Sequence, residues 1–267
     1  MRSLMELSDL SGRRALITGG AGHIALAAAN VLTELNAVVA IIDLNPDSCH
    51  ERSSILNEKR ANCAIAVPCD LLDEQDTRSA VQQVIRELGG LEIIIHCVAY
   101  VDTTQCEGWA VPFEKQSVDV WDRALRINLT SSFVLVQEAQ DALKKTGKGS
   151  VILISSIYGI VGPDMSLYEG TTMNNPVGYG ASKGGLLQLT RYMATILAPN
   201  IRVNAISPGG IWRNQPDIFC ERYEARTPLR RMGTEEDLKG AIAYLASDLS
   251  AYVTGHNLVV DGGWTVW

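Results

Sequence analysis

The chain has 267 residues, of which 46% are hydrophobic and 20% are charged. This composition supplies enough apolar material for a large buried core and excludes an intrinsically disordered chain. The 30 acidic residues outnumber the 23 lysines and arginines, which gives a formal net charge of −7. Because an acidic protein repels phosphate backbones and anionic lipids, we expect neither nucleic acid nor a membrane as a partner.

The cysteines and histidines show no pattern typical of a metal centre. The six cysteines contain no C-x-x-C pair, and the four histidines contain no H-x-x-x-H pair. We therefore expect free thiols in a reducing compartment and no bound metal. The first 20 residues lack the apolar core and small-residue cleavage site of a secretory signal, which favours a cytoplasmic location.

Short β-branched runs alternate along the chain with longer helical patterns. This alternation is typical of βαβ units and predicts one α/β domain over residues 1–267, a doubly wound parallel sheet of seven strands. The expected strands are Arg14–Thr18, Ala37–Asp43, Cys63–Cys69, Leu91–Cys97, Ser150–Ser155, Ile201–Ile206 and Asn257–Val260.

Apolar residues at helical spacing fill the segments between these strands. The expected helices are His23–Leu35, Pro46–Lys59, Glu74–Leu88, Val118–Lys144, Tyr179–Ala198 and Glu235–Ser247. Two irregular stretches, Tyr100–Gln116 and Gly159–Val177, each follow an expected strand. Ligands of open α/β sheets bind at the carboxyl ends of strands, so we expect both stretches to be substrate loops.

The first strand runs into a glycine-rich turn, TGGAGHIA, at residues 18–25. Between a strand and a helix, such a turn lets the backbone approach a pyrophosphate, which the free N–H groups and the helix dipole then bind. The alternative is a tight turn without a ligand. The position of the glycine-rich turn at the start of a βαβ unit favours phosphate binding over this alternative.

Asp43 ends the second strand, at about the distance from the first glycine where an acidic residue accepts the ribose 2′-hydroxyl of NAD. The carboxylate would repel the 2′-phosphate of NADP, and the neighbouring residues offer no basic side chain. Asp43 could instead be a solvated turn residue. Asp70, after the third strand, would lie beside the adenine or would cap the next helix.

Tyr179 and Lys183 stand four residues apart at the start of a predicted helix and share one helical face. A free phenol has a pKa of about 10, and a nearby ammonium would lower that pKa and turn the phenol into a usable acid or base. Such a pair also occurs by chance on many helices. Two upstream residues, Ser156 and Asn128, favour a catalytic role for this pair over a chance occurrence.

Ser156 follows a strand end, where its hydroxyl can bind and polarise a substrate oxygen. Asn128 lies inside a long helical pattern, where asparagine has poor propensity. Its amide would hold a water that relays protons from Lys183, or would simply satisfy local backbone groups.

Nearly the whole chain resembles the short-chain dehydrogenase/reductase family. The motifs that carry the resemblance are TGGAGHIA, Asp43, CDLLD, RINLTSSF, ILISSIYG, YGASKGG, IRVNAISPGG and VTGHNLVVDGGW, in this order. The resemblance implies a Rossmann fold, an NAD-dependent oxidoreductase acting on a CH–OH group, and a homo-oligomer, a tetramer or a dimer. It is closest to family members of bacterial surface-glycan biosynthesis.

The resemblance also implies roles for individual residues. Asn128, Ser156, Tyr179 and Lys183 take the places of the family's catalytic set. Contacts to NAD are expected from Gly19, Gly22, His23, Ile24, Asp43, Asp70, Leu71, Cys97, Ala99, Tyr179, Lys183, Pro208, Gly209 and Ile211. Contacts to the substrate are expected from Ser156, Tyr168, Glu169, Asn175 and Gly210.

The sequence departs from the family pattern at several positions. His96 and Cys97 stand where relatives have two asparagines, and Arg213 replaces a threonine that often follows the Pro-Gly turn. Ala25 replaces the last glycine of the phosphate turn. Tyr179 follows Ser156 by 23 positions, more than is usual in the family, so a segment has been inserted beside the active site.

The inserted segment, PDMSLYEGTTMNNPV, is rich in hydroxyl, amide and acidic groups. A pocket with such walls favours a sugar, a sugar phosphate or a nucleotide sugar. The alternatives are a polyol or sugar-acid dehydrogenase, and an enzyme like a 3-oxoacyl reductase in which the segment is only a lid. A noncatalytic NAD-binding scaffold on the same fold would lack Ser156, Tyr179 or Lys183, and all three are present.

Overall fold

The computed structural model describes residues 1–100 and 106–267. Seven strands form one sheet in the order β3-β2-β1-β4-β5-β6-β7, and every neighbouring pair is parallel. The strands are β1 (Arg14–Thr18), β2 (Val38–Asp43), β3 (Ala64–Pro68), β4 (Ile93–His96), β5 (Gly149–Ile154), β6 (Ile201–Pro208) and β7 (Asn257–Val260). The fold is therefore the predicted doubly wound α/β sheet.

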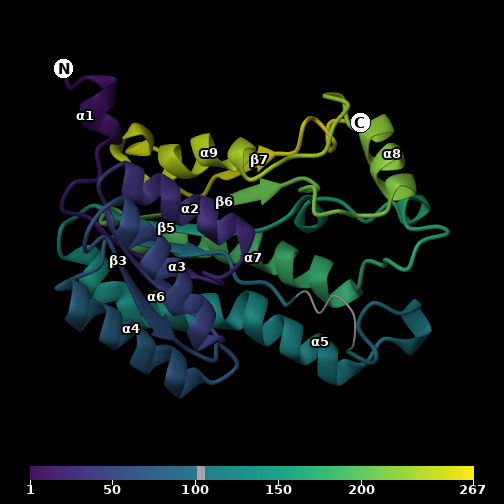
Figure 1. The fold of residues 1–267 in the computed structure, drawn as a ribbon, viewed down its shortest axis with the longest axis horizontal. Coiled ribbons are helices and arrows are strands. Elements are labelled where there is room, and N and C mark those ends of the chain that lie inside the picture. Colours follow the sequence, from purple (N-terminus) through teal and green to yellow (C-terminus); the bar gives the residue numbers. More distant parts are fainter. Residues whose placement is uncertain (101–105) are drawn as a thin grey trace.

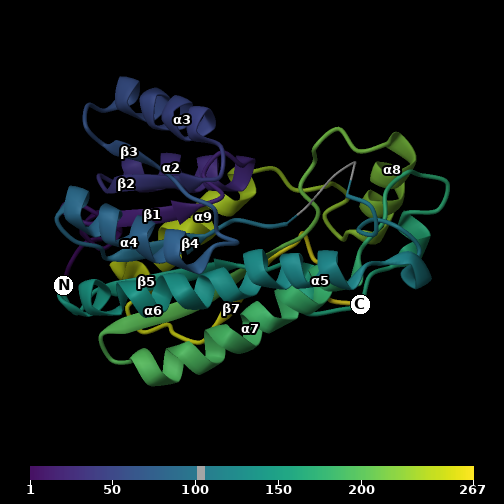
Figure 2. The same ribbon diagram turned by 90° about the horizontal axis from the view of Figure 1, so that it is seen from below.

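Helices cover both faces of the sheet (Figures 1 and 2). Their bounds are α1 (Leu4–Ser8), α2 (His23–Glu34), α3 (Pro46–Lys59), α4 (Glu74–Leu88), α5 (Val118–Leu125), α6 (Ser131–Lys144), α7 (Val177–Leu197), α8 (Asp217–Arg226) and α9 (Glu236–Ala246). Alternate residues of each strand point to opposite faces. In β1, Ala15 and Ile17 join the core with α2, α3 and α9, whereas Leu16 joins the core with α4, α6 and α7.

The predicted elements agree closely with those of the structure, with three differences. The expected helix Val118–Lys144 contains a π-helical turn, η2 (Arg126–Thr130), between α5 and α6. The helix α7 begins two residues before Tyr179, directly after Pro176, whose fixed φ suits a helix start. The helices α1, with five residues, and α8, with ten, were not predicted because both are too short to show a clear helical period.

The parallel arrangement places every strand's carboxyl end at one edge of the sheet. The chain leaves β1 toward the α2 face and leaves β4 toward the α6 face, so a crevice opens between these two strands. Figure 2 shows α8 and the loops around it lying beyond this edge of the sheet. These segments extend the crevice outward.

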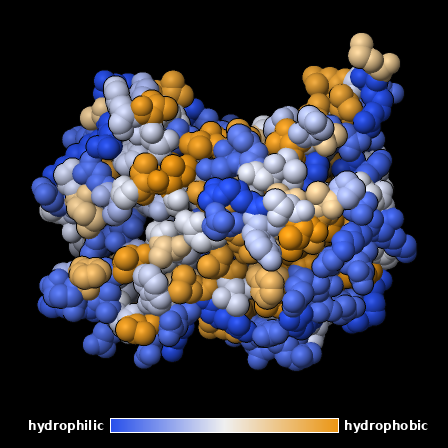
Figure 3. Space-filling model, turned by 180° about the vertical axis from the view of Figure 1, so that it is seen from behind, coloured by the Kyte–Doolittle hydropathy of each residue, from blue (hydrophilic) through white to orange (hydrophobic). Residues whose placement is uncertain are grey.

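The first helix, α1, contains no buried residue and projects from the body of the protein (Figure 3). Elsewhere on the face seen in Figure 3, apolar patches alternate with polar ones. Within residues 1–100 and 106–267, no helix is long and apolar enough to cross a bilayer.

All six cysteines are free thiols. Cys49, Cys63 and Cys69 are buried, whereas Cys97, Cys106 and Cys220 are half-buried. Cys97 differs because it follows the end of β4, where the chain leaves the core and enters the crevice.

Candidate active site

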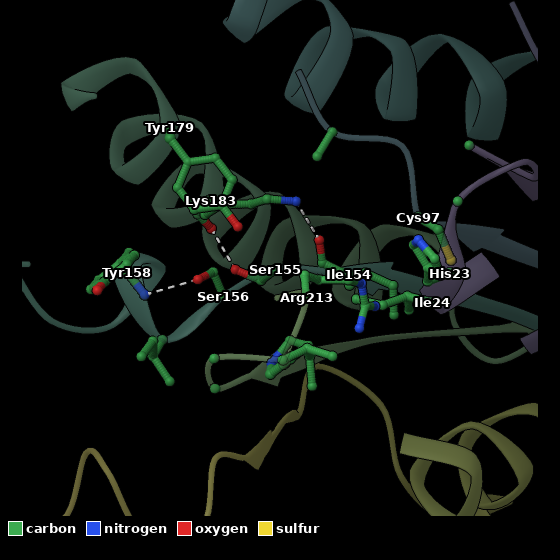
Figure 4. A pocket seen from close by; sticks show the side chains of 18 of the residues that line it. His23, Ile24, Cys97, Ile154, Ser155, Ser156, Tyr158, Tyr179, Lys183 and Arg213 are labelled. Atoms are coloured by element: carbon green, nitrogen blue, oxygen red, sulfur yellow. Dashed lines mark hydrogen bonds between the residues drawn. The ribbon is translucent and has the colours of Figure 1, made fainter. Parts of the chain in front are cut away.

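A cavity of about 660 Å³ lies at the carboxyl edge of the sheet. Its walls come from the glycine turn after β1 and from the ends of β2, β4, β5 and β6, together with α7 and α8 (Figure 4). In Figure 4, Tyr158, Ser156 and Tyr179 lie toward one end of the cavity, and His23, Ile24 and Cys97 lie toward the other.

The glycine turn has the geometry of a phosphate site. Gly19 has a φ of +64°, and a Cβ on it would lie 2.7 Å from the Cα of Val98. Only glycine avoids both the strain and the clash. Gly22 is the N-cap of α2 and provides no side-chain cap, so the first N–H groups of the helix are available to an anion. This geometry fits a dinucleotide pyrophosphate.

The carboxylate of Asp43 lines the same cavity, at the end of β2. Its Oδ2 accepts a hydrogen bond of 3.0 Å from the backbone N–H of Ala21 in the glycine turn. The acid is thus held beside the phosphate turn, and a carboxylate in this place suits a ribose diol.

Most of the predicted cofactor residues line the cavity. They are Gly19, Gly22, His23, Ile24, Asp43, Cys97, Ala99, Tyr179, Lys183, Pro208, Gly209 and Ile211. Asp70 and Leu71 do not line it, and their contact with the adenine stays a prediction. The alternative role of Asp70 as a helix cap is wrong, because Asp73 is the N-cap of α4 and Asp70 instead accepts a bond from the N–H of Leu72.

Ser156 and Tyr179 meet at the end of the cavity. Ser156 follows β5, and its Oγ accepts a bond of 3.2 Å from the N–H of Tyr158, which turns the chain sharply away. Tyr179 lies in the first turn of α7. Burial raises the pKa of Tyr179, and a hydrogen bond with Ser156 opposes that rise.

Lys183 lies one helical turn after Tyr179 and is buried. Its Nζ donates to the carbonyl oxygen of Ile154 at 2.7 Å and lies 5.6 Å from the centroid of the Tyr179 ring. Burial lowers the pKa of Lys183 to about 8. The expectation that this ammonium depresses the pKa of Tyr179 is not met in this arrangement, because desolvation of the phenol dominates.

Asn128 is fully buried and occupies the middle of the π-helical turn. Its Nδ2 donates to the Oγ of Ser182 at 2.9 Å, and its Oδ1 accepts from the N–H of Tyr100 at 2.5 Å. A π-turn inside a helix often marks a functional position. Here the π-turn directs the side chain of Asn128 toward Ser182, the residue before Lys183. The expected water relay between Asn128 and Lys183 stays a prediction.

His96 joins the catalytic framework at the end of β4. Its Nε2 lies 3.2 Å from the carbonyl oxygen of Asn128, and its Nδ1 lies 3.0 Å from the Oγ1 of Thr18. A carbonyl can only accept, so Nε2 carries the proton and the Thr18 hydroxyl donates to Nδ1. Burial, together with the charge of Lys183, lowers the pKa of His96 to about 3.

The substrate end of the cavity is largely aromatic. Of the predicted substrate residues, Ser156, Tyr168 and Gly210 line it. Sequence reasoning missed Tyr158, Met173, Phe219 and Tyr223, which line it too. The position of α8 directly beyond the Pro-Gly turn could have indicated Phe219 and Tyr223, whereas nothing local separates Tyr158 from an ordinary loop residue.

Glu169 and Asn175 do not reach the cavity. Glu169 is exposed, and Asn175 lies behind Tyr168, to whose hydroxyl its Nδ2 donates at 3.3 Å. The expected direct contact of both residues with a substrate gains no support in this arrangement, because packing turns the aromatic ring of Tyr168 toward the cavity and leaves these two neighbours outside its lining. Tyr168 is 8% exposed and also shares a hydrogen bond of 2.8 Å with Tyr158.

The inserted segment is tied to α8 by two arginines. Arg226 forms an ion pair of 2.7 Å with Asp164, and Arg222 donates to the carbonyl oxygens of Ser166 and Glu169. Trp264, from the C-terminal segment, packs with its ring centroid 6.0 Å from that of Tyr223 in α8 and 6.2 Å from that of Tyr158, whose hydroxyl is hydrogen-bonded to Tyr168 of the inserted segment.

Comparison with known proteins identifies the family. The profile of a family described as enoyl-(acyl carrier protein) reductase matches residues 19–265, which include the glycine turn and the Ser156–Tyr179–Lys183 set. The chain is a short-chain dehydrogenase/reductase. It is 33% identical to an L-rhamnose 1-dehydrogenase (NAD(P)(+)) of a Sphingomonas species, over 95% of this chain and 96% of the relative.

Solved structures of this family share the fold along the whole chain. A gluconate 5-dehydrogenase from Burkholderia cenocepacia, in complex with NADP and tartrate, has a TM-score of 0.86 at 26% identity and covers 99% of this chain and 100% of its own. A short-chain dehydrogenase from Leptospira borgpetersenii with bound NAD⁺ has a TM-score of 0.84 at 31% identity, covering 99% and 96%.

The buried His96 predicts a characteristic loss of stability in acid. Its folded-state pKa of about 3 lies below the ordinary value of 6.5, so between these values the unfolded chain binds a proton that the folded chain refuses. Stability therefore falls as the pH falls through this window. The melting temperature of His96→Asn, measured from pH 7 to pH 4, should fall less steeply than that of the wild type.

The exposed His50 supplies a control, and His50→Asn should follow the wild-type curve. Equal slopes for His96→Asn and the wild type would show that this histidine does not contribute to the acid sensitivity.

Proposed function

We propose that this oxidoreductase uses NAD(H) to interconvert a secondary alcohol and a ketone on a neutral sugar or polyol. The observation that supports the proposal is one cavity that joins a phosphate turn with an adjacent carboxylate, the Ser156–Tyr179–Lys183 set and an aromatic substrate end. When bound, the nicotinamide supplies hydride transfer. The residues of the chain supply binding, orientation and the proton.

Tyr179 is the residue that handles the proton. Its raised pKa keeps the phenol protonated at neutral pH, ready to donate to a carbonyl oxygen in the reductive direction. In the oxidative direction the phenol must first lose its proton, and we propose that the charge of Lys183, 5.6 Å from the ring centroid, then offsets part of the desolvation that raises the pKa of the phenol. Ser156, hydrogen-bonded to Tyr179, orients the substrate oxygen beside the phenol.

The choice of NAD(H) rests on Asp43. Its carboxylate lies beside the glycine turn, where it would accept hydrogen bonds from a ribose diol and repel a 2′-phosphate. The relatives do not decide this point, because one carries NADP and another NAD⁺ in the solved structures.

The walls of the cavity favour a neutral substrate. The basic side chains among its lining residues are His23, Lys183 and Arg213. Lys183 belongs to the catalytic set, and Arg213 forms an ion pair of 2.6 Å with Glu235 at the cofactor side. No cation at the aromatic end of this lining would bind a sugar phosphate or the diphosphate of a nucleotide sugar, so the expected likeness to glycan-biosynthesis enzymes gains no support here.

A sugar or polyol suits the aromatic end because it presents apolar C–H faces together with hydroxyls. The rings of Tyr158, Tyr168 and Phe219 offer flat apolar surface, and the phenol hydroxyls offer donors and acceptors. Among the relatives, the rhamnose enzyme acts by name on a neutral sugar, whereas the gluconate enzyme acts by name on the anion of a sugar acid. A 3-oxoacyl substrate is the second candidate, favoured by the same apolar walls.

A direct assay tests the proposal. The enzyme is incubated with NAD⁺ and a panel of neutral sugars, polyols, sugar phosphates and 3-hydroxyacyl thioesters, and the absorbance of reduced nicotinamide is followed. Turnover of neutral sugars or polyols supports the proposal. Turnover of the thioesters alone would favour the second candidate, and no turnover of any compound in either direction would favour a noncatalytic scaffold.

Tyr179→Phe should lower kcat at least a hundredfold, because general acid–base catalysis contributes about 10²- to 10⁴-fold. The affinity for NAD⁺, measured by calorimetry, should stay close to that of the wild type. Activity retained by Tyr179→Phe would remove this residue from the mechanism.

NAD⁺ should bind at least about tenfold more tightly than NADP⁺, which corresponds to about 1.4 kcal/mol. Asp43→Ser should narrow this ratio because it removes the charge that repels the 2′-phosphate. Calorimetric titrations of both cofactors measure the ratio. Equal affinities for the wild type would contradict the assignment of NAD.

Tyr168→Phe should lower kcat/KM for the preferred sugar or polyol about fivefold to tenfold, because it removes one buried hydroxyl worth about 1 kcal/mol. Activity toward a small alcohol without further hydroxyls should stay unchanged. Glu169→Gln, one position along but exposed, is the matched control and should change neither activity. Equal losses on all substrates would mean that Tyr168 only supports the fold.

A further inference from the structure

Three ionisable side chains from distant parts of the chain meet beside the cofactor end of the cavity. Arg213, in the loop after β6, forms an ion pair of 2.6 Å with Glu235 at the start of α9. His23, the first residue of α2, places its Nδ1 3.6 Å from the same carboxylate oxygen. His23 and Arg213 line the cavity, as Figure 4 shows, whereas Glu235 is not among its lining residues.

The backbone of Arg213 is held by Gln215, whereas its guanidinium makes the ion pair with Glu235 and donates a bond of 2.7 Å to the carbonyl oxygen of the adjacent Trp212. Gln215 accepts a bond of 2.6 Å from the N–H of Arg213 and donates one of 2.9 Å to the carbonyl oxygen of Ile211. The side chains of Arg213 and Glu235 are 29% and 31% exposed. An ion pair this open to water is worth little, so a stronger anion can replace Glu235 at small cost.

A dinucleotide pyrophosphate is such an anion. The uncapped N-terminus of α2 begins at His23, next to this ion pair, and is the natural place for the phosphates. A pyrophosphate carries two negative charges against the single charge of Glu235. The planar guanidinium can also donate two parallel hydrogen bonds to phosphate oxygens.

We propose that Arg213 binds the pyrophosphate of the cofactor and that Glu235 is the counter-ion which holds the guanidinium until the cofactor arrives. This inference rests on the dinucleotide binding of the proposed function. Glu235 lowers the affinity for the cofactor because it competes with the pyrophosphate for Arg213. It also speeds cofactor release, since it recaptures the guanidinium.

The test measures binding of NAD⁺, ADP-ribose and adenosine by calorimetry, without catalysis. ADP-ribose keeps the pyrophosphate and lacks the nicotinamide, and adenosine lacks both. Arg213→Gln should weaken NAD⁺ and ADP-ribose about tenfold, or about 1.4 kcal/mol, and should leave adenosine unchanged. Glu235→Gln should tighten the same two ligands about threefold, or about 0.7 kcal/mol, and should slow NAD⁺ release in stopped flow.

The double variant separates this exchange from a merely structural role. If Glu235 acts through Arg213, then Glu235→Gln should have no effect on ADP-ribose binding in the Arg213→Gln background. Arg86→Gln and Glu236→Gln change the net charge equally at exposed positions and should bind all three ligands as the wild type does. Thermal unfolding checks that each variant is folded.

Two results would overturn the proposal. One is unchanged ADP-ribose affinity in folded Arg213→Gln, and the other is an equal effect of Glu235→Gln in both backgrounds. Either result, with normal NAD⁺ binding by the wild type, removes the role of Arg213 alone. A wild type that binds neither NAD⁺ nor NADP⁺ would instead remove the proposed function, and this inference with it.

Discussion

The parallel direction of all seven strands is the constraint on which the rest of the molecule depends. It brings the ends of β1, β2, β4, β5 and β6 to one edge, although the residues there are far apart in the sequence. The chain leaves β1 and β4 toward opposite faces, so no helix fills the space between them. The glycine turn and Asp43 thereby come to share one cavity with Tyr179.

The end of the cavity around Lys183 is polar although it is buried. Hydrogen bonds within the protein offset the free energy of removing these polar groups from water. Burial disfavours a charge unless hydrogen bonds replace water. Lys183 donates to the carbonyl oxygen of Ile154, and Asn128 is bonded at both ends of its amide. His96, neutral between Thr18 and Asn128, ties the first and fourth strands to the π-turn. The departure from the family's asparagines at this position therefore keeps a full set of polar contacts.

The inserted segment is an integral wall of the cavity, to whose lining it contributes Tyr168 and Met173. Arg222 and Arg226 attach it to α8, and Trp264 joins the same hydrophobic cluster as Tyr168, so segments distant in sequence support the ring of Tyr168. A wall tied at these points restrains the size and shape of the substrate more than a free lid would. Its aromatic inner surface and polar outer surface also explain why its composition alone suggested a polar pocket.

The sequence by itself determined the order and type of the main elements, because helical periodicity is local and strong in segments such as Glu74–Leu88, and short apolar runs mark strands such as Arg14–Thr18. Motif spacing likewise indicated the phosphate turn, Asp43 and the Ser156–Tyr179–Lys183 set. The tertiary structure alone decided that Tyr168 faces the pocket while Glu169 faces water, that Lys183 binds a backbone carbonyl, and that Arg213 meets Glu235. These outcomes depend on packing and desolvation between segments that are far apart in the chain. Local residue patterns therefore do not predict them.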